Sequence, residues 1–206
     1  GYSITPKALG LSGSKVYDGG SVVLASELPT ISGLIGSETV VIGSQTTTST
    51  SLSTGARKNV ASNVAIQPNA VGITVSNGSN GGLAANYTLT GGTHQVNITK
   101  APVSVALSRQ YDGSTNASSN ATDSNTNETF SGLVGSETLT LSGQGSVSSK
   151  NYSASTQAVT LGTLAIGNQS GATLSSGGLA SNYNFTSATL AINKKVLNSN
   201  SSRVYN

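Results

Sequence analysis

The sequence Lys15-Val16-Tyr17-Asp18-Gly19 occurs repeatedly along the chain, and this repetition decides the fold. It returns as Arg109-Gln110-Tyr111-Asp112-Gly113 and again as Arg203-Val204-Tyr205-Asn206, with equal spacing between the three tyrosines. Such a long-period repeat marks a structural module of about 94 residues. The sequence therefore predicts one module at residues 1–97, a second at 98–193, and the start of a third, truncated module at 194–206.

Two further blocks recur in the same order in both copies. Residues 31–40 (ISGLIGSETV) correspond to 130–139 (FSGLVGSETL), and residues 81–87 (GGLAANY) correspond to 177–183 (GGLASNY). The second copy has a longer segment from Ser114 to Asn127, which is almost wholly Ser, Thr and Asn and is typical of an exposed loop. No Gly- or Ser-rich linker separates the copies, because Ala101-Pro102-Val103 directly follows Lys100. This junction predicts restricted hinge motion.

The secondary structure expected from hydrophobic periodicity is β throughout. Val103, Val105 and Leu107 alternate with small polar or alanine residues, and residues 138–141 and 183–186 alternate in the same way. No sustained helical pattern is present. Several short strands without helices predict an all-β fold, specifically two tandem immunoglobulin-like β-sandwich modules that form an elongated rod.

Composition excludes several classes of protein. Charged residues make up 8% of the 206 residues, cysteine is absent, and Ser, Thr, Asn and Gly dominate the surface-forming positions. The net charge of +3 comes from dispersed Lys and Arg residues, so we expect no nucleic-acid partner. No apolar run is long enough to span a membrane, and we expect no membrane insertion. The lack of start signals and the end within a third repeat predict a piece of a longer array.

The Tyr-Asp-Gly motif has two interpretations. As a structural corner, Asp18 and Asp112 would bind backbone N–H groups two residues ahead, while Gly19 and Gly113 would supply positive φ angles. As a ligand site, Tyr17 or Tyr111 would be an exposed aromatic contact. The turn chemistry of the motif favours the corner.

The Gly-Ser-Glu motif also has a structural and a chemical interpretation. Glu38 or Glu137 would be the base of an enzyme, but neither has a second carboxylate, a histidine or a cysteine near it in sequence. We therefore expect no enzyme activity. The alternative is a tight hairpin turn at Gly36 or Gly135, after which the next strand runs back.

A lysine–asparagine isopeptide cross-link is a further hypothesis, since such bonds need a lysine, an asparagine and a buried acid. Lys7 or Lys100 and Asn86 or Asn182 are the candidate partners, beside Glu38 or Glu137. The lysines would otherwise mark a polar edge strand. We expect no metal and no cofactor, because the acidic residues are scattered and His94 is the only histidine.

The order of these motifs, with the closing Ile98-Thr99-Lys100-Ala101, resembles the YDG repeats and the related "mostly beta, conserved glycine" (MBG) repeats of large bacterial exoproteins. Many of those proteins look like filamentous-haemagglutinin-type virulence adhesins exported by two-partner secretion. The resemblance implies an extracellular array of immunoglobulin-like modules at the bacterial surface. It supplies no catalytic residues.

Two functions are consistent with these features of the sequence. The first is a monomeric stalk or spacer whose partners are the neighbouring repeats and which projects a binding or effector region. The alternative is an adhesive module that itself binds a host-cell surface protein or glycan, through the segment 114–127 and exposed tyrosines. That segment has no aromatic residue, and Asp123 is its only charged residue, which favours the spacer.

Overall fold

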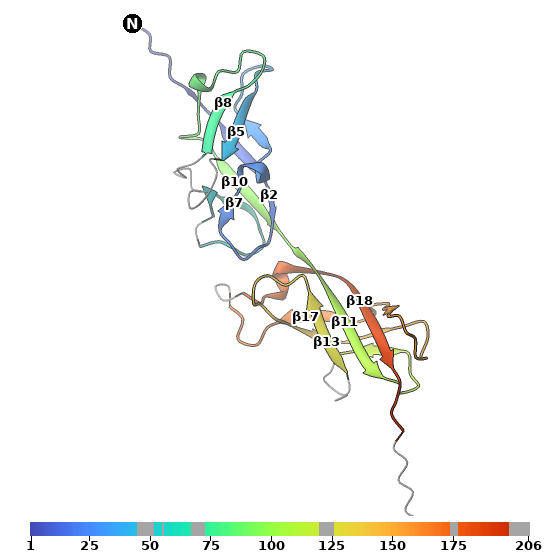
Figure 1. Ribbon diagram of the computed structural model, residues 1–206. Coiled ribbons are helices and arrows are strands. Elements are labelled where there is room, and N and C mark those ends of the chain that lie inside the picture. The colour runs from blue at the N-terminus through green and yellow to red at the C-terminus, as the bar shows by residue number, and fades with distance from the viewer. Residues whose placement is uncertain (45–51, 55, 67–72, 120–125, 174–176, 198–206) are drawn as a thin grey trace, which may run out of the picture. The chain divides into compact units, whose positions relative to one another are not determined.

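The computed structural model describes residues 1–44, 52–54, 56–66, 73–119, 126–173 and 177–197. The chain is mostly β, with three single-turn 3₁₀ helices in its described part, and it divides into two units, Gly1–Ala101 and Pro102–Asn206 (Figure 1). The predicted boundary at 97/98 falls inside strand β10 (His94–Thr99). The start of a third repeat, including Tyr205 and Asn206, lies outside the described residues from residue 198 on.

The first unit is built around a four-stranded sheet in the order β4-β2-β10-β7. The two central strands are parallel, with Leu11 opposite His94 and Val16 opposite Thr99, whereas both outer strands are antiparallel to their neighbours. Two-stranded pairs β1-β9, β3-β6 and β5-β8 complete the unit. Its elements are β1 Lys7–Ala8, β2 Gly10–Val16, β3 Val22–Val23, η1 Ala25–Glu27, β4 Thr30–Ser32, β5 Val40–Ser44, β6 Leu52–Ser53, β7 Ala61–Ala65, β8 Ile73–Asn77, η2 Ala84–Asn86, β9 Tyr87–Thr88 and β10.

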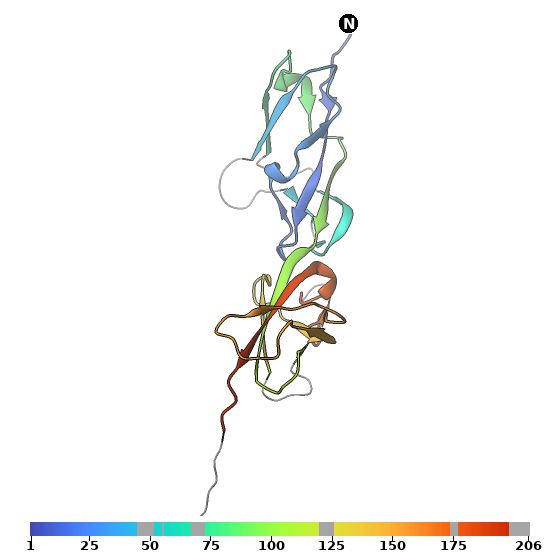
Figure 2. The same cartoon turned by 90° about the vertical axis from the view of Figure 1, so that its right-hand side faces the viewer.

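The second unit repeats this plan with a longer central pair of strands. Its four-stranded sheet has the order β13-β11-β18-β16, and the central pair β11 and β18 lies side by side with both arrows running the same way (Figures 1 and 2). The pairs β12-β15 and β14-β17 correspond to β3-β6 and β5-β8 of the first unit. The elements are β11 Ala101–Gln110, β12 Asn116–Ser118, β13 Asn127–Ser131, β14 Leu139–Ser142, β15 Gln144–Ser146, β16 Gln157–Ala158, β17 Ala165–Asn168, η3 Ala180–Asn182 and β18 Tyr183–Asn193.

Each unit has its own apolar core beneath the four-stranded sheet. In the second unit the alternate residues of β11 and β18 pack against Ala117 of β12, Leu141 of β14 and Leu164, which directly precedes β17. In the first unit, Leu9, Val40 and Tyr87 form a buried cluster, against which partly buried residues such as Ile31 and Ile42 pack. The predicted alternation is confirmed: every odd-numbered residue of β11 is buried, and Leu139 and Leu141 are buried while Thr140 is exposed. None of the described sheets is closed.

The chain passes between the units with almost no intervening sequence. Strand β10 ends at Thr99 and β11 begins at Ala101, so Lys100 is the single residue between them. The N–H of Tyr17 donates to the carbonyl of Thr99 at 2.8 Å, and that of Tyr111 donates to the carbonyl of Asn193 at the same distance. In both units the last strand therefore ends against the Tyr-Asp-Gly motif.

Candidate functional site: the repeated polar motifs

The Tyr-Asp-Gly motif of the first unit is a turn that follows β2. Asp18 Oδ1 accepts a hydrogen bond from the N–H of Gly20 at 2.8 Å, and Gly19 has a φ of 73°. This is the aspartate turn expected when the side chain satisfies a backbone donor two residues ahead. Tyr17 is buried.

A buried cation holds this turn together. Lys15, which is only 3% exposed, lies with its Nζ 3.0 Å from Asp18 Oδ1 and donates to the carbonyls of Gly20 and Val22. Burying an ammonium is costly unless it is paired and hydrogen-bonded, and these oxygens meet that need. Lys15 therefore ties the end of β2 to the start of β3.

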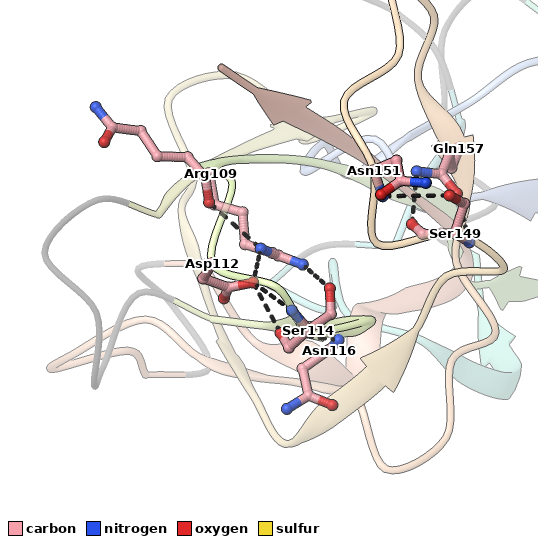
Figure 3. Close-up of polar contacts among 8 residues, drawn as sticks. Arg109, Asp112, Ser114, Asn116, Ser149, Asn151 and Gln157 are labelled. Atoms are coloured by element: carbon pink, nitrogen blue, oxygen red, sulfur yellow. Dashed lines mark hydrogen bonds and ion pairs between the residues drawn. The ribbon is translucent and has the colours of Figure 1, made fainter. Parts of the chain in front are cut away.

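The second unit has the same arrangement with arginine in place of lysine (Figure 3). Arg109 is 4% exposed, and its guanidinium donates to Asp112 Oδ1 and to the carbonyls of Gln110 at 3.3 Å and Ser114 at 2.7 Å. Asp112 Oδ1 also accepts from the N–H of Ser114 at 2.8 Å and from its hydroxyl at 3.0 Å. Gly113 has a φ of 83°. Tyr111 is 36% exposed, unlike Tyr17, so the two copies differ in how far the ring is covered.

Opposing effects act on the ionisation of Asp112. Burial raises its pKa, but the hydrogen bonds from Ser114 and the neighbouring Arg109 charge outweigh burial and hold the pKa below its usual value. Asp112 is therefore a carboxylate at neutral pH.

The Gly-Ser-Glu block and the Gly-Gly-Leu-Ala block meet in space through a tyrosine–glutamate hydrogen bond. In the second unit the Tyr183 hydroxyl donates to Glu137 Oε2 at 2.6 Å and accepts from the N–H of Val134 at 3.1 Å. In the first unit the Tyr87 hydroxyl donates to Glu38 and accepts from the N–H of Ile35 at 3.1 Å. Both tyrosines are buried.

These environments suppress ionisation of both tyrosines. Burial, followed by the hydrogen bond to Glu137, raises the pKa of Tyr183 to about 12. For Tyr87 the hydrogen bond to Glu38 is the main cause of a raised pKa. Each glutamate thus has a tyrosine hydroxyl bound to it, and its identifiable role is to hold the turn that precedes it.

The turn itself differs from the expected hairpin. Glu38 N–H donates to the Ile35 carbonyl at 3.0 Å, Glu137 N–H donates to the Val134 carbonyl at 3.1 Å, and Gly36 and Gly135 have φ angles of 53° and 56°. However, the flanking strands do not pair with each other: β4 pairs with β2 and β5 with β8, and in the second unit β13 pairs with β11 and β14 with β17. The hairpin interpretation is wrong, because the turn carries the chain from one sheet to another.

The residues considered for an isopeptide bond lie in unlike environments. Lys7 and Lys100 are exposed, whereas the reaction needs a desolvated amine. Lys7 lies opposite Tyr87 in the β1–β9 register, next to Asn86, which is exposed. Asn182 is fully buried. The cross-link remains a prediction that intact-mass spectrometry tests through the loss of one ammonia per bond.

Two features of these motifs are seen only in the structure. The sequence patterns do not connect Glu38 with Tyr87 or Glu137 with Tyr183, although both tyrosines close a repeated block. They also do not predict the burial of the cation. A signal for it is nevertheless present, since a Lys or Arg stands two residues before the tyrosine in every copy.

Metal-binding clusters and membrane-spanning helices are both missing from the described residues. These residues contain no group of three or more His, Asp and Glu side chains able to hold a metal ion. In the part of the chain that the structure describes, none of the helices has the length and apolar character required to cross a bilayer.

Comparison with known protein families finds a YDG domain at residues 93–190. The match begins just before β10 and ends within β18, so it covers the second Tyr-Asp-Gly turn, the second Gly-Ser-Glu turn and Tyr183. Comparison with curated proteins and with solved structures gives no match.

Proposed function

We propose that the chain is a structural stalk segment of a secreted bacterial surface adhesin, in which immunoglobulin-like β-sandwich modules act as spacers that project a binding or effector region. The modules would be extracellular and monomeric, with neighbouring repeats as their partners. This proposal extends the YDG domain found at residues 93–190 to the context in which such repeats are expected.

The observation that carries the proposal is that the repeated motifs are used internally. Asp18 and Asp112 bind the turn that follows them, and Glu38 and Glu137 bind a buried tyrosine of their own unit. Residues that recur in both units thus serve the fold of each unit, as a repeated spacer requires.

The junction supports the same function. A single residue, Lys100, separates β10 from β11, and Pro102 follows in the new strand. Proline and strand pairing both restrict backbone rotation, so this connection differs from a flexible Gly/Ser linker.

Small-angle X-ray scattering of the chain tests the proposal. A compact globule of this length would have a radius of gyration of about 17 Å. Two strand-length modules placed end to end, a rod of about 66 Å, should give about 20 Å. A variant with Gly-Ser-Gly-Ser inserted after Lys100 is the matched control, and it should broaden the distribution of interatomic distances. A radius near the compact value, or an insertion without effect, would count against a stalk.

A further inference from the structure

The second unit has a polar pocket beside its Tyr-Asp-Gly turn. Its volume is about 510 Å³, within the ~300–1,000 Å³ range of small-molecule sites. The lining side chains are mostly hydroxyls and amides, with one arginine and one carboxylate. The lining residues are Arg109, Asp112, Ser114, Asn116, Ser118, Thr126, Gly143, Gln144 and Thr163.

The register of β12 against β15 places three of these polar side chains together. Asn116 lies opposite Ser146 and Ser118 lies opposite Gln144, while the residue between Asn116 and Ser118, Ala117, is completely buried. Because side chains alternate along a strand, Asn116, Ser118 and Gln144 share the face opposite to the core. Asn116 and Gln144 are exposed and Ser118 is half-buried, and among the described residues none of the three side chains has a hydrogen-bond partner.

Asp112 presents one oxygen in the same place. Its Oδ1 is occupied by the N–H and hydroxyl of Ser114 and by Arg109, whereas no described residue donates a hydrogen bond to Oδ2. The side chain is 41% exposed. A carboxylate oxygen that is fixed by its neighbours and open to solvent is a good acceptor for ligand hydroxyl groups.

The charge of the pocket limits the ligand to a neutral molecule. Arg109 is neutralised by Asp112, and its Nη atoms donate to Asp112 and to backbone carbonyls (Figure 3). An anion would meet the Asp112 carboxylate without a free cation, and a metal ion would find a single carboxylate where it prefers several oxygen ligands. Hydroxyl groups suit this mixture of amides, a hydroxyl and a carboxylate oxygen.

The first unit lacks the polar groups of Asn116 and Ser118. Counting from Tyr17 and Tyr111, the positions of Asn116 and Ser118 are taken by Val22 and Leu24, which are 45% and 50% exposed. The turn is therefore common to both units, but the polar groups above it belong to the second unit.

We propose that this pocket is a binding site for a neutral carbohydrate, with Asp112 Oδ2 accepting hydrogen bonds from sugar hydroxyls and with Asn116, Ser118 and Gln144 binding the adjacent oxygens. The site goes beyond a stalk function and does not depend on it. No aromatic side chain of the described residues lines the pocket to stack on a sugar ring, so the expected affinity for a monosaccharide is in the millimolar range.

Titration of the ¹⁵N-labelled chain with a panel of methyl glycopyranosides tests this site by NMR. The expected result for at least one glycoside is a saturable shift of amide signals at residues 112–118 and 143–144, with first-unit signals unchanged. The double variant N116V/S118L gives the second unit the residues of the first, and it should weaken binding about tenfold because two hydrogen bonds are lost. The variant V22N/L24S is the matched control, with unchanged affinity.

Three outcomes would overturn the proposal. The first is the absence of pocket shifts at about 100 mM glycoside, well above the expected dissociation constant. The second is equal affinity in N116V/S118L, provided that its urea midpoint shows that it folds. The third is an equal response to per-O-methylated glycosides, which cannot donate to Asp112. Pocket shifts with sulfate or calcium but with no glycoside count as the first outcome.

Discussion

Replacing Tyr183 by phenylalanine isolates the hydrogen bonds that join the two repeated blocks of the second unit. The ring is 1% exposed and phenylalanine preserves its packing, so the substitution removes the hydroxyl alone. That hydroxyl accepts from the N–H of Val134 at 3.1 Å and donates to Glu137 at 2.6 Å. The Y183F variant therefore loses one neutral and one charge-assisted hydrogen bond.

The expected cost follows from these two bonds. A neutral hydrogen bond contributes about 1 kcal/mol and one to a charged group about 1.5–3 kcal/mol. Glu137 is half-buried and gains access to water when the hydroxyl is removed, which offsets part of the loss. We expect the free energy of unfolding of the second unit to fall by about 2 kcal/mol, equivalent to a Tm about 10 °C lower for a domain of this size.

Urea unfolding followed by residue-resolved NMR is the appropriate measurement, because it reports each unit separately and needs no tryptophan, which the chain lacks. Y111F is the matched control in the same unit, since Tyr111 is partly exposed and its hydroxyl has no partner among the described residues. It should change stability by less than about 0.5 kcal/mol. Y87F should destabilise the first unit by an amount similar to the effect of Y183F on the second.

Equal effects of Y183F and Y111F would refute this role of the Tyr183 hydroxyl. A loss of stability in the first unit as large as that in the second would refute it too, because the bonds concerned lie within one unit.

Four other outcomes are expected. First, the pKa of Tyr183 is raised to about 12 in the folded chain, whereas a tyrosine in the unfolded chain has a pKa of about 10. The contribution of the protonated hydroxyl to the stability of the second unit is therefore complete below about pH 10 and is lost as the pH rises towards 12. Urea midpoints measured from pH 9 to 12 should decline, and the decline should be smaller in Y183F. Second, Gly132→Ala should lower the free energy of unfolding by about 3 kcal/mol, because the added Cβ would lie 2.4 Å from the Pro102 carbonyl oxygen and the residue has a φ of 92°. Gly135→Ala, where no atom lies near the added Cβ, should lower it by about 1 kcal/mol in the same assay. Third, Arg109→Met should lower the free energy of unfolding of the second unit by about 2 kcal/mol, because the hydrogen bonds to the turn carbonyls are lost. Arg109→Lys should retain most of the stability, since Lys15 makes the corresponding bonds in the first unit. A lysine variant as unstable as the methionine variant would contradict this. Fourth, His94→Ala should destabilise the first unit alone by about 2 kcal/mol, because the buried ring accepts from the Leu11 N–H and donates to the Leu89 carbonyl, and amide exchange at Leu11 should rise.

Strand positions were predictable from sequence because burial on one face leaves a period of two. The predicted inward residues of β11 are buried, and the alternation at residues 139–141 holds as well. The repeat was predictable for a different reason, since two copies of one sequence must adopt equivalent folds. Both signals are local or depend on simple alignment.

The pairing between strands was harder to predict from the sequence. The Gly-Ser-Glu turn has the glycine and the hydrogen bond of a hairpin turn, yet it joins strands of different sheets. A turn specifies the reversal of the chain over four residues, whereas pairing depends on partners far away, such as β17 for β14. The Tyr183–Glu137 bond was inaccessible for the same reason, because its partners are far apart in sequence.

The buried cation shows how an unusual composition can conceal a structural role. Only 8% of the residues are charged, so each charged residue is a natural candidate for binding a ligand or a substrate. Lys15 and Arg109 are nevertheless among the most buried polar residues described, and both pair with the aspartate three positions ahead. The charge is retained because the hydrogen bonds of Lys15 Nζ and of the Arg109 Nη atoms replace water that burial removes, although Arg109 Nε has no partner among the described residues.

Comparison of the two copies separates residues that serve the fold from residues that can serve a ligand. Positions at which both copies place the same group, such as Asp18 and Asp112, are explained by contacts within their own unit. Asn116 stands where the first unit has Val22, and both positions are exposed, so no demand of the fold accounts for the amide. Carbohydrate recognition is accordingly expected where the two copies differ, and the N116V/S118L variant should weaken binding with little change in the free energy of unfolding of the second unit.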